Sequence, residues 1–350
     1  MPLYAILADQ RFGPSRSKTA NAIIRYRPSE VAAVVDSSSS GRSAQDVLGY
    51  GADIPIVDGL KEALALGADA LLIGVAPAGG TLPRAWRPIV AESLRAGLDV
   101  VSGLHARLAS DPEFSRLSGR GGARIVDLRH SDPTTWTTAR GRWRSRQTPV
   151  VLSVGTDCNV GKMTALWEVH LHLLNSGVRS AFVGTGQTGI LLSGRGVAVD
   201  AVVSDFVSGV VEAQVEAAIS ELCPDVVLVE GQGALTSLPY SGVTLGLLHG
   251  AMPDAMLMVH QPARTHDHIG CRIPQLSDVI DHHNRTMAFF NGARVVAVGV
   301  NGFGLPPESL LRSVEAIEAE TGLPTIDAVA SGPGVLADAI TRTFGLVPAR

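Results

Sequence analysis

A strand, a glycine-bearing turn and a helix follow one another in Val151-Leu-Ser-Val-Gly155-Thr156-Asp157-Cys158-Asn159-Val160-Gly161-Lys162-Met163-Thr164. The apolar residues before Gly155 predict a buried strand, and residues 165–174 carry apolar side chains at helical spacing. Glycines let the backbone turn so that successive N–H groups face one point, and the helix adds the positive end of its dipole. Together with the charge of Lys162, these groups predict that residues 155–164 form a cradle for phosphate.

Two departures from the usual phosphate-loop pattern bear on the ligand. Five residues, 156–160, separate the glycines where the pattern has four. Met163 stands where a Ser or Thr would hold Mg²⁺, and the next hydroxyl, on Thr164, is turned by about 100° around the helix. The sequence therefore predicts phosphate binding and leaves the use of a Mg²⁺–nucleotide open, with Thr164 and Glu230 as metal contacts if Mg²⁺ is used.

Length and composition indicate the class of protein. The chain has 350 residues, 45% of them hydrophobic and 18% charged, with 38 glycines. The length predicts two or three domains with sizeable cores, and the composition is typical of an α/β enzyme with many tight turns. The net charge of −4 gives no strong attraction to nucleic acid or to an anionic membrane, so a small-molecule partner is expected. Widely spaced cysteines and the lack of a signal pattern or a membrane-length apolar run favour a cytoplasmic protein. We also expect a homo-oligomer.

Strands and helices alternate through residues 1–127, which predicts a Rossmann-like, doubly wound domain. The expected strands are residues 3–8, 31–35, 54–57, 69–74 and 98–105. The turn after the first strand lacks the G-x-G-x-x-G fingerprint of dinucleotide-binding domains. Asp36 ends the second strand, where it either caps the next turn or holds a ribose. The glycine loop at 76–81 is expected at the carboxyl edge of the sheet, where such folds bind ligands.

Residues 128–148 interrupt this alternation and are expected to link the two domains. The segment is rich in arginine and contains Arg129, Arg140, Arg142, Arg144 and Arg146. Such a run is usually solvated; the alternative is that some of the guanidinium groups pair with bound phosphates. The shortness of the run and the acidic net charge argue against nucleic acid as the partner.

A second parallel-sheet domain, of the P-loop NTPase type, is predicted for residues 149–350. Its later strands are expected at 179–184, 225–230, 255–259, 294–300 and 324–329. The first of these leads into a loop of glycines and hydroxyls on the same sheet edge as the phosphate loop. That loop contains Thr185, Gly186, Gln187, Thr188 and Gly189. Glu230 ends a strongly apolar strand, where it either binds Mg²⁺ through water or caps the next helix.

The histidines do not predict a metal site. His266 and His268 are two residues apart, and His282 and His283 are adjacent, and neither pair has a third ligand at a known spacing. We therefore expect no metal at these positions.

Several motifs resemble those of known families. The phosphate loop and Val229-Glu-Gly-Gln-Gly233 resemble motifs of dethiobiotin synthetase. A second resemblance covers nearly the whole chain. Besides the phosphate loop, it rests on Leu72-Ile-Gly-Val-Ala-Pro-Ala-Gly-Gly80, Asp99-Val-Val-Ser-Gly-Leu-His105, Thr185-Gly-Gln-Thr-Gly-Ile190, Asp200-Ala-Val-Val-Ser-Asp-Phe206, Leu228-Val-Glu-Gly-Gln-Gly233 and Ser241-Gly-Val-Thr-Leu-Gly-Leu-Leu-His-Gly250. The chain thereby resembles a bacterial and archaeal family that joins an N-terminal Rossmann-like domain to a C-terminal P-loop domain. Some members of that family are D-glutamate, or more broadly D-amino acid, N-acetyltransferases that use acetyl-CoA.

The resemblance implies transfer of an acetyl group from acetyl-CoA to the amine of a small amino acid, with the phosphate loop holding the phosphates of CoA. Such a reaction needs a base for the ammonium proton and donors for the oxyanion. The candidate bases are Glu230, Asp205, His249 and His260. Backbone N–H groups of Gly186 to Gly189 are candidates for the oxyanion site, and Arg195 or Arg264 for the substrate carboxylate.

Two other functions remain open at this point. The dethiobiotin synthetase resemblance implies an ATP- and Mg²⁺-dependent kinase or ligase that acts through a phosphorylated carboxylate. A nucleotide-binding regulatory protein without catalysis is the third possibility. Lys162 is expected to support ligand binding in all three, whereas Glu230 is expected to act through a metal only in the ATP-dependent enzyme.

Overall fold

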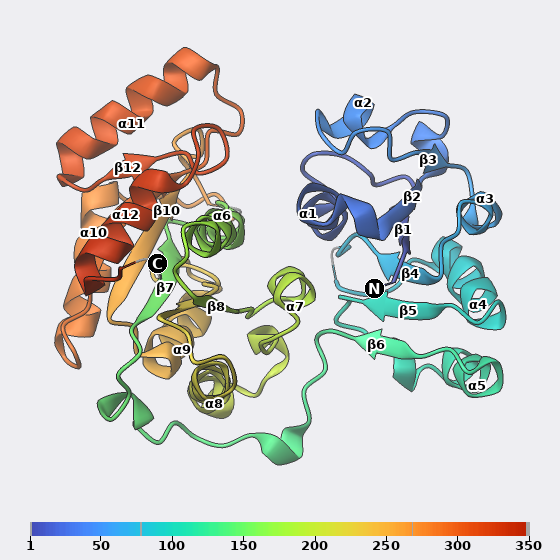
Figure 1. Cartoon of the computed structure of the whole chain (residues 1–350), viewed down its shortest axis with the longest axis horizontal. Coiled ribbons are helices and arrows are strands. Elements are labelled where there is room, and N and C mark those ends of the chain that lie inside the picture. The colour runs from blue at the N-terminus through green and yellow to red at the C-terminus, as the bar shows by residue number, and fades with distance from the viewer. Residues whose placement is uncertain (1, 78, 268, 348–350) are drawn as a thin grey trace. The chain divides into compact units, whose positions relative to one another are not determined.

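The computed structural model describes residues 2–77, 79–267 and 269–347 (Figure 1). The chain divides into two compact units. The first unit contains Met1–Ser131 with Ile190–Gly194, and the second contains Asp132–Gly189 with Arg195–Arg350. Among the helices of the described residues, none is long and apolar enough to cross a membrane.

In the described part of the chain, the first unit is built on a sheet of six parallel strands. The strands are β1 (Tyr4–Leu7), β2 (Val31–Val35), β3 (Ile56–Val57), β4 (Ala70–Ile73), β5 (Asp99–Ser102) and β6 (Ile125–Asp127). Their order in the sheet is β3-β2-β1-β4-β5-β6, which confirms the predicted Rossmann-like, doubly wound fold. One face is covered by α1 (Lys18–Tyr26), and the other by α3 (Leu60–Ala65), α4 (Arg87–Arg95) and α5 (Pro112–Gly121) (Figure 1). The short helix α2 (Ala44–Leu48) lies between β2 and β3.

The carboxyl ends of β1, β2 and β4 are level. Leu7 at the end of β1 pairs with Val35 in β2 and with Ile73 in β4. Ala20 N in α1 donates a hydrogen bond of 3.0 Å to Gly74 O, just after β4. A Cβ at Gly74 would lie 2.5 Å from Ile6 Cγ2, so a larger residue would push the loop after β4 away from the sheet. The loops that follow β1 and β4 therefore leave the sheet next to each other.

Asp36 caps the turn that follows β2. Its Oδ1 accepts hydrogen bonds from Ser38 N at 3.3 Å and from Gln10 N at 2.6 Å, and the residue is fully buried. Of the two interpretations of this residue, the contacts support the cap, because one carboxylate oxygen already satisfies two backbone donors.

The second unit also contains a parallel sheet, with six strands in the residues described. They are β7 (Val150–Gly155), β8 (Ser180–Val183), β9 (Val226–Val229), β10 (Ala255–His260), β11 (Arg294–Val300) and β12 (Thr325–Ile326), in the order β12-β11-β10-β7-β9-β8. Helices α6 (Lys162–Asn175) and α12 (Gly334–Phe344) cover one face, and α8 (Ser204–Leu222), α9 (Ser241–Ala251) and α10 (Leu276–Ala288) cover the other (Figure 1). Helix α11 (Pro307–Thr321) packs against α10. This confirms the predicted P-loop type of parallel α/β fold.

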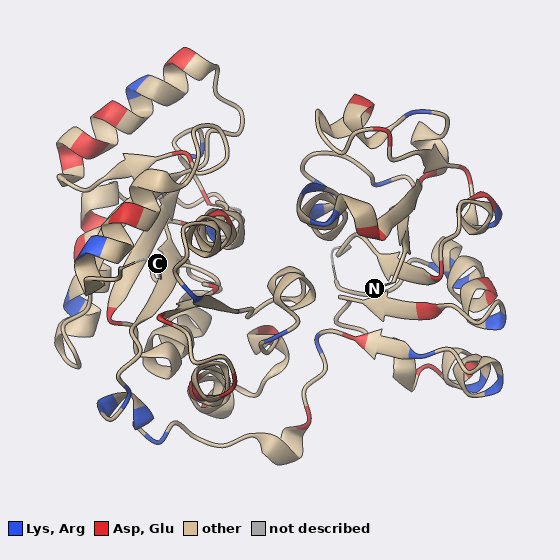
Figure 2. Ribbon diagram, in the orientation of Figure 1, with Lys and Arg blue, Asp and Glu red and all other residues tan. Residues whose placement is uncertain are grey.

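The core of the second unit lies on both faces of its sheet, since all six residues of β7 are buried, and one cluster fills the face that α8 and α9 cover. Val154, Val229 and Met258 from the strands pack with Val211 of α8 and Leu248 of α9, and all are almost completely buried. Figure 2 shows that charged residues concentrate on helices and loops and are sparse in the strands. Burial on both faces explains why these strands read as nearly continuous apolar runs.

Two sequence-based expectations are wrong in detail. Residues Gln187–Ser193 form helix α7, so the loop after β8 is limited to Gly184, Thr185 and Gly186. A Cβ at Gly189 would overlap Glu230 Oε2, so the glycine leaves room for the Glu230 side chain and does not mark the end of a helix. The strand expected at 324–329 contains only the short β12.

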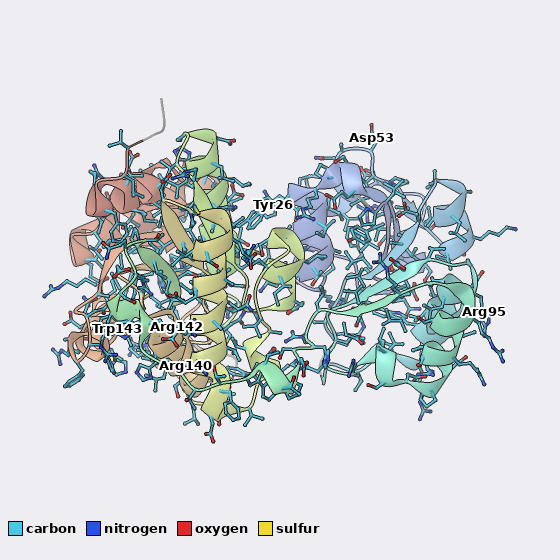
Figure 3. All side chains as sticks on the ribbon, turned by 60° about the horizontal axis from the view of Figure 1, so that its bottom comes forward. Tyr26, Asp53, Arg95, Arg140, Arg142 and Trp143 are labelled. Carbon is cyan, nitrogen blue, oxygen red and sulfur yellow. The ribbon has the colours of Figure 1, made fainter. Side chains whose placement is uncertain are left out.

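The arginine-rich segment is held against the second unit. Arg140 N and Arg142 N donate to the Glu212 carboxylate of α8 at 2.6 and 2.8 Å, and Figure 3 shows these residues as part of that unit. The side chain of Arg146 is 6% exposed, and its guanidinium contacts Asp254 and the backbone carbonyl of Met252. At Arg146 the expectation of a solvated run is wrong, because the side chain satisfies buried acceptors of the fold.

Candidate functional site

The phosphate loop joins β7 to α6 at the carboxyl edge of the second sheet. Asn159 and Gly161 have φ values of 56° and 105°, in the left-handed region that glycine favours. A Cβ at Gly155 would lie 3.0 Å from Val259 O of the neighbouring strand, so the loop is packed closely against β10. The backbone therefore turns sharply twice before α6 begins at Lys162.

Lys162 places its charge inside this loop. Its side chain is 6% exposed, and Nζ donates to Asp157 O at 2.8 Å and to Gly233 O at 2.7 Å. The first oxygen belongs to the phosphate loop and the second to the segment after β9. A buried ammonium group whose partners are neutral carbonyl oxygens favours the binding of an anion in the cradle.

Arg264 brings a second cation to the loop from the segment after β10. Its Nη1 donates to Asp157 Oδ2 at 3.0 Å and to Cys158 O at 2.7 Å. Asp157 is completely buried, so its carboxylate and Arg264 compensate one another in charge. The guanidinium group of Arg264 therefore lies at the phosphate loop, as expected from the sequence for an arginine that binds the ligand.

Asn301 supports the loop and was not anticipated as a site residue. It follows β11, and its Nδ2 donates to Val160 O at 3.0 Å. A Cβ at Gly161 would lie 3.3 Å from the same Nδ2. The available sequence signal was a polar residue directly after a buried parallel strand.

Glu230 joins the two glycine-rich regions of the second unit. Its side chain lies at the end of β9 and is 2% exposed. Oε2 accepts from Thr185 N at 2.9 Å and from Gly186 N at 3.1 Å, and Oε1 accepts from Gln232 Nε2 at 3.3 Å. The carboxylate thus holds the turn before α7 through charge-assisted hydrogen bonds.

The segment after Glu230 is pressed onto β7. Gly231 N donates to Ser153 Oγ at 2.9 Å, and a Cβ at Gly231 would overlap the carbonyl oxygen of Ser153. Ser153 is fully buried and is a second supporting residue that sequence reasoning missed. Its signal was a single polar side chain in the middle of an apolar strand.

His260 is the histidine that the structure places at the phosphate loop. It ends β10, and its Nδ1 lies 3.0 Å from Thr156 Oγ1. Burial lowers the pKa of His260, and this outweighs the opposite effect of Glu320. The imidazole is therefore neutral at neutral pH, which is the form that can accept a proton.

The other nominated residues have different neighbours. His249 is in the last turn of α9, which runs from the carboxyl end of β9 to the amino end of β10, and its ring packs against Phe290 with 5.1 Å between centroids. His249 is thus at the sheet edge opposite the phosphate loop. Asp205 is exposed in the first turn of α8, and Arg195 pairs with Glu221 at 2.8 Å.

Thr164, one of the residues considered for a metal, follows Met163 in the first turn of α6. Met163 is buried at the start of α6, and Thr164 beside it is half-buried. Within residues 2–77, 79–267 and 269–347, no group of three or more His, Cys, Asp or Glu side chains is arranged to hold a metal ion. His268, one of the weak candidates, lies outside the described residues.

Comparison with known proteins extends over both units. Residues 137–337 match a family model described as the DUF1611 C-terminal P-loop domain, a domain of unknown function, and residues 37–131 match the DUF1611 N-terminal Rossmann-like domain. A protein of Tritonibacter scottomollicae named D-glutamate N-acetyltransferase is 35% identical over 304 residues, which are 83% of this chain and 87% of that protein. A protein of the same name from a Pseudoalteromonas species is 35% identical over 279 residues, 77% of this chain and 81% of the relative.

A solved structure shows the same architecture. The crystal structure of a DUF1611 family protein from Anabaena variabilis is 34% identical in sequence, with a TM-score of 0.91. The match covers 98% of this chain and 100% of that chain. The chain is thus similar to proteins named D-glutamate N-acetyltransferase, and it belongs to the DUF1611 family, which joins a Rossmann-like domain to a P-loop domain.

Proposed function

We propose that this protein transfers an acetyl group from acetyl-CoA to the amine of a small amino acid such as D-glutamate. The observation that carries the proposal is the 35% identity to proteins named D-glutamate N-acetyltransferase, which extends over 83% of the chain in one case. The matched length spans both units and includes the phosphate loop region, so the likeness is not limited to a common nucleotide-binding motif.

The phosphate loop is proposed to hold the phosphates of CoA. The proposed contacts are the backbone N–H groups of residues 155–164 and the Lys162 ammonium, which the loop already encloses. Met163 occupies the place of the hydroxyl that binds Mg²⁺ in P-loop enzymes, and its side chain is 4% exposed. Acetyl transfer does not require a metal-bridged γ-phosphate, so this departure is compatible with a CoA ligand.

His260 is the proposed base among the four candidates. Its neutral imidazole lies beside Thr156 of the phosphate loop, whereas the Glu230 carboxylate is engaged by backbone N–H groups. In the proposed step, His260 takes a proton from the substrate ammonium, and the amine nitrogen attacks the thioester carbonyl carbon. The C–N bond forms and the C–S bond breaks, the second proton of the nitrogen passes to the departing CoA thiolate, and His260 releases the first proton to water as it returns to neutrality.

The backbone N–H groups of residues 186–189, in the turn before α7 and in the first residues of that helix, are the proposed oxyanion site. The Gly186 N–H donates to Glu230 Oε2, so it would exchange this carboxylate oxygen for the oxyanion. Arg264 is the proposed partner of the substrate carboxylate, since a guanidinium can bind a carboxylate through two parallel hydrogen bonds. In the free protein, Asp157 occupies that guanidinium, so substrate binding would exchange one carboxylate for another.

The test is an acetylation assay with the purified full chain. Release of the CoA thiol and formation of the N-acetyl product by mass spectrometry are measured with D-glutamate, L-glutamate and other D-amino acids, with Mg²⁺ or with EDTA. Lys162→Met removes a charge-assisted contact to phosphate of about 1.5–3 kcal/mol, so the KM for acetyl-CoA should rise roughly 10- to 150-fold. The matched control is Lys61→Met, because Lys61 is an exposed lysine of the first unit.

The same assay distinguishes acetyl transfer from the alternative, an ATP-dependent kinase or ligase. If no amino acid is acetylated and ATP is consumed only with Mg²⁺, the acetyltransferase proposal is wrong and the ATP-dependent kinase or ligase takes its place. An unchanged KM in Lys162→Met together with intact acetylation would refute the assignment of the phosphate loop to CoA and leave the reaction standing.

A further inference from the structure

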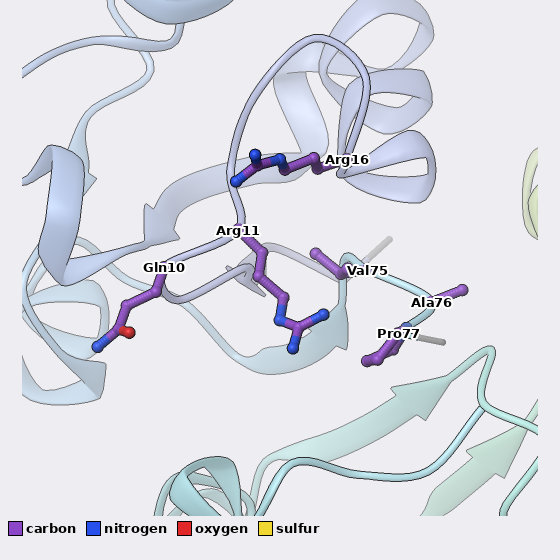
Figure 4. A pocket seen from close by; sticks show the side chains of 6 residues that line it. All are labelled: Gln10, Arg11, Arg16, Val75, Ala76 and Pro77. Carbon is purple, nitrogen blue, oxygen red and sulfur yellow. The ribbon is translucent and has the colours of Figure 1, made fainter. Parts of the chain in front are cut away.

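A cavity of about 430 Å³ lies in the first unit. It is lined by Gln10, Arg11, Arg16, Val75, Ala76 and Pro77 (Figure 4). The first three residues belong to the loop between β1 and α1, and the other three to the loop after β4. Figure 4 shows the side chain of Arg11 extending toward the loop that carries Pro77.

The position of the cavity in the sheet is the one at which doubly wound folds bind ligands. The strand order β3-β2-β1-β4-β5-β6 reverses its direction between β1 and β4. Leu7 pairs with Ile73, so the two strands end at the same level and their loops diverge around a crevice. Ligands of open α/β sheets bind outside the carboxyl ends of the strands at this point.

The charge of the cavity is positive. Both charged side chains in its lining, those of Arg11 and Arg16, are arginines, and both residues are exposed. Among the residues that the structure describes, neither has an acidic partner within salt-bridge distance, in contrast to Arg87 and Arg124 of the same unit, which pair with carboxylates at 2.7 and 2.6 Å. Two unpaired guanidinium groups at one cavity favour an anionic ligand.

Nearby carboxylates are engaged by the backbone. Asp9 Oδ1 accepts from Ser37 N at 2.9 Å, and Asp36 Oδ1 accepts from Gln10 N at 2.6 Å. Asp9 and Asp36 therefore stabilise the loops through backbone hydrogen bonds. The charged side chains in the lining are those of Arg11 and Arg16.

The loop that carries the arginines is fixed by buried polar contacts. Ser17 is fully buried, and its Oγ accepts from Gly13 N at 3.0 Å. Asn21 Nδ2 in α1 donates to Gly13 O at 3.0 Å and to Pro14 O at 3.1 Å. The backbone between Arg11 and Arg16 is therefore held in one conformation, which lowers the entropic cost of binding a ligand there.

We propose that this cavity binds a small molecule through an anionic oxygen group, a phosphate or a carboxylate, with Arg11 and Arg16 as its partners. Val75, Ala76 and Pro77 offer an apolar wall to the uncharged part of the ligand, and the Gln10 amide offers one neutral hydrogen-bonding group. The lining residues belong to the first unit and the phosphate loop to the second, and the inference does not depend on the acetyltransferase proposal.

The test measures binding of inorganic phosphate and of glutarate to the full chain by isothermal titration calorimetry. The measurement is made in the Lys162→Met background, so that the phosphate loop does not dominate the signal. The double variant R11Q/R16Q is compared with R116Q/R120Q, which removes two exposed arginines of α5 and changes the net charge equally. A third variant, R11K/R16K, keeps the charge and removes the planar guanidinium groups.

We expect one site for at least one probe, with affinity at least tenfold weaker in R11Q/R16Q, intermediate in R11K/R16K and within twofold of the parent in R116Q/R120Q. Binding of phosphate alone identifies a phosphate-bearing ligand, and binding of glutarate alone identifies a carboxylate. The inference is overturned if neither probe binds, if R11Q/R16Q binds as the parent does, or if R116Q/R120Q weakens binding equally. Acetylation is not the readout, so failure here leaves the proposed function standing.

Discussion

The Glu230 carboxylate is expected to stabilise the second unit by satisfying backbone donors that would otherwise be buried without an acceptor. Its Oε2 accepts from Thr185 N and Gly186 N, at 2.9 and 3.1 Å, in a position where the side chain is 2% exposed. Glu230→Ala removes this acceptor, and Glu230→Gln keeps an oxygen of similar shape without its charge. The two variants therefore separate the loss of hydrogen bonds from the loss of charge.

The magnitude follows from the two hydrogen bonds. A buried donor left without its acceptor costs about 1–3 kcal/mol, so two such donors predict a loss of roughly 2–6 kcal/mol of unfolding free energy in Glu230→Ala. Hydrogen bonds to charged groups are worth about 1.5–3 kcal/mol and neutral ones about 0.5–1.5, so Glu230→Gln should lose roughly 2 kcal/mol over two bonds. The expected order of stability is the parent, then Glu230→Gln, then Glu230→Ala.

The assay must report on the second unit alone, because a chain of two units does not unfold in one transition. Trp86 belongs to the first unit, whereas Trp136, Trp143 and Trp167 belong to the second. In a Trp86→Phe background, urea unfolding followed by tryptophan fluorescence therefore measures the second unit. The matched control is Glu315→Gln, an exposed residue of α11, which should change the unfolding free energy by less than about 0.5 kcal/mol.

Either of two results would refute the reasoning. If Glu230→Ala unfolds with the same free energy as Glu315→Gln, the hydrogen bonds to Thr185 and Gly186 do not stabilise the unit. If Glu230→Gln loses as much as Glu230→Ala, the retained oxygen does not act as an acceptor, and the cost comes from the charge alone.

Two further predictions concern packing and pH in the second unit. A Cβ at Gly209 of α8 would overlap the carbonyl oxygen of Thr137, so Gly209→Ala should lower the unfolding free energy by roughly 1–3 kcal/mol. At Gly242 in α9 a Cβ meets nothing within 4 Å, so Gly242→Ala should leave the unfolding free energy unchanged or raise it by up to about 1 kcal/mol. Equal urea midpoints for the two variants would contradict this prediction. Burial lowers the pKa of both His170 and His283 to about 4, so the unfolded state takes up protons that the folded state excludes as the pH falls below about 6.5. The unfolding free energy should therefore fall between pH 7 and pH 5 by about 2 kcal/mol for each histidine, and His283→Gln should reduce that slope in urea unfolding at the two pH values; an unchanged slope would show that His283 does not titrate in this way.

Sequence patterns located most of the regular elements of this chain. The apolar stretches at β2 and β11 coincide with the expected strands, because parallel strands buried on both faces are continuous apolar runs of limited length. Helix α7 could not be located in this way, because glycine at position 189 has a low helix propensity. Glycine is required there because a Cβ would overlap the Glu230 carboxylate. Likewise, the arginine-rich sequence predicts a solvated side chain for Arg146, whereas in the structure this side chain is buried and pairs with Asp254.

The candidate site was predictable only in part. Because the loops after parallel strands emerge at one edge, the sequence could place the phosphate loop, Glu230 and His260 on the same edge of the second sheet. The same argument did not identify Ser153 and Asn301, which support the loops through single hydrogen bonds. It also allowed His249 as a base, although the length of α9 carries that residue to the opposite edge.

The sequence by itself determined the two parallel α/β units, the phosphate loop and the succession of strands and loops along the chain, because these depend on patterns among residues close together in the chain. Only the tertiary structure decided which side chains meet. Glu230 reaches Thr185 N across 45 positions of the chain and Arg264 reaches Asp157 across 107, while Arg11 faces the loop after β4. Such contacts depend on strand order, register and side-chain conformation, which arise from the packing of the whole unit and leave no local signature in the sequence.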